Sequence, residues 1–65
     1  MPTELDIFRS ASVLIEHHGE KAAHEAAERA VRMHARGDHD GAHVWWAILN
    51  AIETLQKTMP EGAVN

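Results

Sequence analysis

Six histidines are the side chains in this 65-residue sequence with the widest range of chemistry. They are His17, His18, His24, His34, His39 and His43. An imidazole can ligate a metal ion, and it can change its charge near neutral pH. His39 and His43 are four residues apart, the spacing at which one helix can present two imidazoles to the same ion. This pair makes a histidine-based metal-binding or pH-sensing protein one alternative function.

Two imidazoles are only half of a tetrahedral zinc site. The chain has no cysteine to complete it, and Asp40 lies about 100° around the predicted helix from His39. We therefore predict no metal and no other cofactor, and we keep His39 and His43 as the alternative metal ligands.

Signatures of catalysis are also missing from the sequence. It contains no cysteine and no tyrosine, no Gly-x-Ser-x-Gly turn and no glycine-rich phosphate loop. The Gly-Asp-His-Asp-Gly segment at 37–41 is shorter than an EF-hand loop and has no distal glutamate. We predict that the protein is not an enzyme.

Nucleic-acid binding is a third, weaker alternative. The net charge is −4, whereas nucleic-acid binders are usually basic or carry a dense basic stripe. The best candidate row on one helix face consists of Lys21, Arg29, Arg32 and Arg36. Glu25 and Glu28 interrupt this row. Asp38 and Asp40 would repel phosphate at the helix start that a helix-turn-helix directs toward DNA.

The elements that must position these residues are helices separated by glycine-containing breaks. Hydrophobic residues recur at helical spacing in three segments, so we predict helices over 3–18, 20–36 and 39–58. Thr3 can cap the first helix together with Asp6, and Gly19 suits a left-handed position at its end. Gly37 suits the end of the second helix, and Asp38 then caps the third.

The predicted fold is all-α: a small three-helix antiparallel bundle in one domain at 3–59, with a frayed tail at 60–65. The middle segment offers mainly alanines to the core, whereas Trp45, Ile48 and Ile52 lie on one face of the third helix. A single core this small rarely supplies more than roughly 3–5 kcal/mol. We therefore predict that self-association completes the bundle.

An outward stripe on the third helix predicts the contact surface. It consists of His39, His43, Trp46, Asn50, Glu53 and Lys57. Tryptophan is enriched among the residues that dominate binding energy at interfaces, and Val13 is a second apolar residue outside the predicted core. We predict partner binding through Trp46, His43, Asn50 and Val13, either in a homodimer or with an unidentified protein partner.

The chain carries no pattern that favours a membrane. Its longest apolar run, 44–49, is far below the roughly 20 residues that a spanning helix needs. Its first ten residues lack the basic and apolar regions of a signal peptide. We predict a cytoplasmic protein that acts as a small interaction or regulatory module.

Four blocks of the sequence resemble a known family. They are Arg-Ser-Ala-Ser-Val-Leu-Ile at 9–15, His-Gly-Glu at 18–20, Gly-Asp-His-Asp-Gly at 37–41 and Val-Trp-Trp-Ala-Ile-Leu at 44–49. Over residues 6–55 the chain is similar to a family of short proteobacterial proteins known as a domain of unknown function. The resemblance implies a bacterial protein and brings no activity. Trp45 matches the tryptophan of the family, and Trp46 stands where a polar residue is expected.

Overall fold

The regular structure of this chain is entirely helical in the part that the computed structural model describes, residues 2–58. Helix α1 (Glu4–His18) passes through the short 3-10 helix η1 (Gly19–Lys21) into α2 (Ala22–Ala35), and α3 (His39–Thr58) follows. This confirms the all-α prediction. The residues from 4 to 35 form one bent helical segment, whereas the corner at 36–38 separates α2 from α3 fully. The predicted tail at 60–65 lies outside the described residues.

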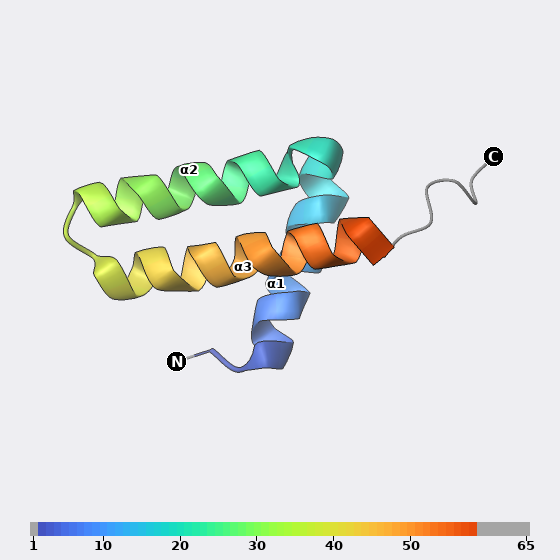
Figure 1. Ribbon diagram of the computed structural model, residues 1–65, viewed down its shortest axis with the longest axis horizontal. Helices are drawn as coiled ribbons and strands as arrows, with labels where there is room; N and C mark the ends of the chain where they lie inside the picture. Colours follow the sequence, from blue (N-terminus) through green and yellow to red (C-terminus); the bar gives the residue numbers. More distant parts are fainter. Residues whose placement is uncertain (1, 59–65) are drawn as a thin grey trace.

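Figure 1 shows α2 and α3 side by side and antiparallel, as the short connection predicts. Helix α1 does not run alongside them. It crosses behind α3 near the end of the pair where α2 begins and covers only that part of the far side, whereas the opposite side faces the viewer (Figure 1). None of the helices in the described part of the chain is long and apolar enough to cross a membrane.

The start of α1 is fixed by a capping box, as its sequence predicts. The Thr3 hydroxyl accepts a hydrogen bond of 3.1 Å from the backbone N–H of Asp6, and the Asp6 carboxylate accepts one of 3.1 Å from the backbone N–H of Thr3. Two of the N–H groups that a helix start leaves without partners are thereby satisfied.

Gly19 makes the bend between α1 and α2. Its φ of 56° is positive, as predicted, but its ψ of −126° lies outside the left-handed helical region. Only glycine adopts this combination without steric cost, because it has no Cβ. The chain therefore turns sharply at Gly19 and continues as helix. The side chain of Gln56 on α3 secures the bend by donating a 3.1 Å hydrogen bond to the Gly19 carbonyl.

The corner between α2 and α3 follows the predicted capping pattern in detail. Gly37 has a φ of 82°, its N–H donates to the His34 carbonyl, and the N–H of Asp38 donates to the Met33 carbonyl. This pair of hydrogen bonds is a Schellman motif. Asp38 then caps α3, because its Oδ1 accepts a 2.9 Å hydrogen bond from the N–H of Gly41.

The core is thin and consists mainly of alanines. The buried hydrophobic residues are Ala11, Leu14, Ala22, Ala26, Ala30, Ala42, Ile48, Ala51 and Ile52. Alanines let the helices approach closely but bury little apolar area. Larger side chains from α1 and α3, including Phe8, Trp45 and Leu49, are only partly buried where they pack against this cluster. The predicted contrast between the two tryptophans holds, since Trp46 is exposed.

Candidate functional site

The uncovered side of the α2–α3 pair carries exposed apolar side chains. Val31 follows buried Ala30 by one position, and Trp46 follows half-buried Trp45 by one position. In two antiparallel right-handed helices, both of these steps turn the side chain toward the same side of the pair. We call this side, with Ala27, Val31 and Trp46, the Trp46 face. Trp46 is 41% exposed and Val31 is 59% exposed.

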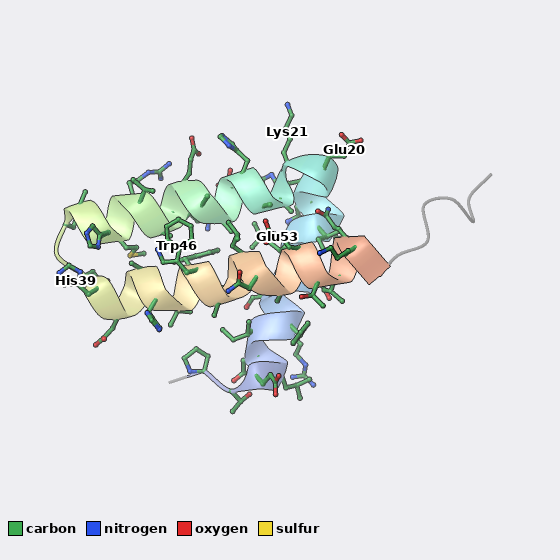
Figure 2. The ribbon with its side chains drawn as sticks, in the orientation of Figure 1. Glu20, Lys21, His39, Trp46 and Glu53 are labelled. Atoms are coloured by element: carbon green, nitrogen blue, oxygen red, sulfur yellow. The ribbon has the colours of Figure 1, made fainter. Side chains whose placement is uncertain are left out.

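Figure 2 shows how the predicted stripe lies on this face. His39, Trp46 and Glu53 follow one another along the side of α3 nearest the viewer, while α1 passes behind α3. His43 and Asn50, which complete the predicted contact set on this helix, are also exposed. Asn50, however, borders a shallow hollow between α1 and α3 that Ile7 and Phe8 also line.

Val13 lies in a different place from Trp46. It is 49% exposed and borders an open hollow of about 400 Å³, which we call the arginine hollow. Its lining consists of Arg9, Ser10, Val13, Leu14, His17, His18, Arg29 and Trp45. Because Trp46 is not among these residues, the structure does not join the four predicted contact residues into one hollow.

The arginine hollow is a concentration of positive charge in an acidic chain. A smaller hollow of about 220 Å³ shares Arg29 and Trp45 with it and adds Arg32, Met33 and Arg36. Together the two hollows are lined by all four arginines of the sequence. Among residues 2–58, no carboxylate lines either hollow. The arrangement can attract an anionic group over an apolar floor.

Arg29 connects the two hollows and is held in place on both sides. Its guanidinium lies 5.0 Å from the centre of the Trp45 ring, within the range of a cation–π contact. Its Nε donates a 3.0 Å hydrogen bond to Glu25. Glu28 lies 3.7 Å from Arg32 in a more exposed pair. The basic row predicted on the second helix is thus partly neutralised by the two glutamates that interrupt it.

The histidines meet in a pair that the sequence spacing did not indicate. The Nδ1 atoms of His34 and His39 are 3.2 Å apart, and their ring centres are 4.7 Å apart. The chain reversal at the corner brings these two rings together across five positions. His43, the predicted partner of His39, is exposed. No group of three or more histidine, cysteine, aspartate or glutamate side chains within residues 2–58 is arranged to hold a metal ion.

Sequence reasoning missed two of these features. It placed Arg29 in a basic row on one helix face, and it did not pair His34 with His39. The signal for the first was available, since a cation at 29 lies on the flank of α2 next to the buried face. The His34–His39 pair has no such signal, because it depends on how closely the corner brings the residues on its two sides together.

No protein family, no curated protein and no solved structure matches this chain.

Proposed function

We propose that the chain is a small protein-interaction module that pairs with a second copy of itself through the Trp46 face, and that it acts by binding and not by catalysis. In this proposal the second copy completes the helical bundle, and the module works in the bacterial cytoplasm. The observation that carries the proposal is the exposure of Trp46 and Val31, with Trp46 on the side of α3 that faces away from α1 (Figure 2).

The amount of apolar surface sets the expected strength of this pairing. A tryptophan side chain buries up to about 250 Å², so Trp46, at 41% exposure, still offers roughly 100 Å² per protomer. Covering this area in both copies contributes about 5 kcal/mol, and Val31 adds a comparable share. Association itself costs at least about 4 kcal/mol, because the two chains lose translational and rotational freedom. We therefore expect a dimer that forms at about tens of micromolar or above.

Sedimentation equilibrium from about 5 to 500 μM tests the proposal. We expect the mass to rise from that of a monomer, 7.2 kDa, toward twice this value. Trp46→Lys and Val31→Lys should each hold the chain at 7.2 kDa. Leu5→Lys is the matched control, because Leu5 is 58% exposed but lies on α1. A monomeric wild-type chain over the whole range, or equal loss in the Leu5→Lys variant, would refute the assignment.

The arginine hollow favours a second candidate function, the docking of an acidic segment of another protein. Among the described residues no carboxylate forms an ion pair with Arg9 or Arg36, so both guanidinium groups are available to an external carboxylate. Val13 and Trp45 offer apolar contact beside them. A protein of net charge −4 needs such a local reversal of charge to attract an acidic partner.

An NMR titration with a peptide of alternating glutamate and leucine tests this second candidate. Amide shifts should concentrate on α1 and α2 around the hollow, and an Arg9→Gln and Arg36→Gln double variant should weaken binding about tenfold or more. Lys57→Gln is the control, since Lys57 lines neither hollow. Equal weakening by the control, or tighter binding of a DNA oligonucleotide than of the peptide, would exclude the assignment.

A further inference from the structure

We propose that His34 and His39 supply two ligands of a Zn²⁺ site that joins the end of α2 to the start of α3. The two imidazoles come from different helices and point toward each other, with their Nδ1 atoms 3.2 Å apart. Both side chains are exposed, and His39 lies at the outer end of the helix pair (Figure 2). The site is therefore open to an ion and to water.

The separation of the two nitrogens fits a shared metal ion. Zinc binds histidine nitrogen at about 2.0–2.1 Å with tetrahedral angles, which places two nitrogen ligands of one ion about 3.3–3.4 Å apart. The observed 3.2 Å is close to this span. Each ring has to turn so that its lone pair points to one side of the line between the nitrogens. Rotation about χ2 of a histidine is soft enough to allow this.

The same distance also fits a hydrogen bond, and the two states place the protons differently. In the hydrogen-bonded pair one ring keeps a proton on Nδ1 and donates it to the other ring. In the zinc-bound pair both Nδ1 lone pairs go to the ion, and both protons are on Nε2. Because both rings are exposed, water can solvate each Nε2–H group. The exchange therefore leaves no buried polar group without a partner.

The corner holds the two histidines in this relation before any ion arrives. The carbonyl of His34 accepts a hydrogen bond of 2.9 Å from the N–H of Gly37, and the Asp38 cap fixes the first turn of α3. Two ligands positioned by the backbone lose little freedom when an ion binds. Carboxylates at Asp38 and Asp40 lie next to His39 in the sequence and offset the positive charge of Arg36.

Water fills the remaining positions around the ion, since no third histidine, cysteine or carboxylate of the described residues joins the group. The site is accordingly weaker than a structural zinc site with four protein ligands. Both ligands belong to one chain, so the inference does not depend on the proposed self-association.

Isothermal titration of the EDTA-treated protein with ZnCl₂ measures this binding. We expect one ion per chain, and we expect His34→Gln and His39→Gln each to weaken the affinity at least tenfold, as loss of a direct ligand requires. His24→Gln is the matched control, because His24 is an exposed histidine of α2 that lies 3.6 Å from Glu28 instead.

NMR of the histidine side chains in the wild-type chain supplies a readout without any substitution. Zinc should shift the Nδ1 signals of His34 and His39 and leave the other rings unchanged. Loss of binding in His43→Gln with retention in His34→Gln would place the ion on the His39–His43 pair of one helix and overturn the assignment. Equal weakening by His24→Gln, or no binding at all, would overturn it as well.

Discussion

Gly41 sits where an alanine should strengthen a helix, and we predict that here it does not. In a helix interior, alanine is favoured over glycine by about 1 kcal/mol. A Cβ on Gly41 would lie 2.6 Å from Oδ2 and 2.9 Å from Cγ of Asp38. The Asp38 carboxylate must rotate away, and it then loses the 2.9 Å hydrogen bond that it accepts from the N–H of residue 41. Loss of such a cap costs about 0.5–2 kcal/mol.

The gain in helix propensity and the loss of the Asp38 cap oppose each other. Gly41→Ala alone should therefore change the free energy of unfolding by less than about 0.5 kcal/mol. Asp38→Ala alone should cost about 1 kcal/mol. In the Asp38→Ala background the obstacle is gone, and Gly41→Ala should then stabilise the fold by up to about 1 kcal/mol. A double-mutant cycle of Asp38→Ala and Gly41→Ala should therefore give a coupling energy of about 1 kcal/mol between the two positions.

Urea denaturation followed by tryptophan fluorescence measures all four chains, since the slope with urea should stay constant. For a domain of this size, 1 kcal/mol also shifts the melting temperature by roughly 4–8 °C. Additive effects of the two substitutions would show that the Asp38 side chain does not cap α3 through the N–H of Gly41. A rise in stability by the full helix propensity of about 1 kcal/mol for Gly41→Ala in the wild-type background would contradict the Asp38 cap as well.

Three further substitutions test the packing and the bend. Trp45→Ala should lower the free energy of unfolding by about 3 kcal/mol, because the ring is half-buried and carries the contact with Arg29. Trp46→Ala in dilute, monomeric protein should lower it by less than about 1 kcal/mol. Equal losses in urea denaturation would contradict the assigned rotation of α3. Gly19→Ala should cost about 1–3 kcal/mol, since a φ of 56° with ψ of −126° is strained for any residue with a Cβ. A thermal melt of this variant that is unchanged would show that the bend can relax.

The features predicted correctly from the sequence are those decided within a few residues. Thr3 with Asp6, and Gly37 with Asp38, form caps whose partners lie no more than five positions away. Such hydrogen bonds depend on local backbone geometry, so residue type and spacing are sufficient to predict them. The exposure of Trp46 beside half-buried Trp45 likewise follows from helical periodicity alone.

The features that could not be predicted depend on how the helices meet. The ψ of Gly19 determines the direction in which α2 leaves α1, and glycine tolerates several values there. Helix α1 therefore crosses α3, although we predicted that all three helices pack as an antiparallel bundle (Figure 1). The crossing in turn gathers Arg9 of α1 and Arg29 of α2 around Trp45. No pattern within a single helix contains that information.

The histidine pair shows how local geometry and tertiary contact combine at one point. A spacing rule for one helix selected His39 and His43, but the corner reverses the chain and brings His34 to His39. On our zinc proposal, an ion at 100 times its dissociation constant stabilises the fold by about 2.7 kcal/mol. That exceeds the roughly 1 kcal/mol of a single cap and approaches the roughly 3–5 kcal/mol that a single small core supplies. Zinc bound at the corner between α2 and α3 would thus add substantially to the stability of this chain.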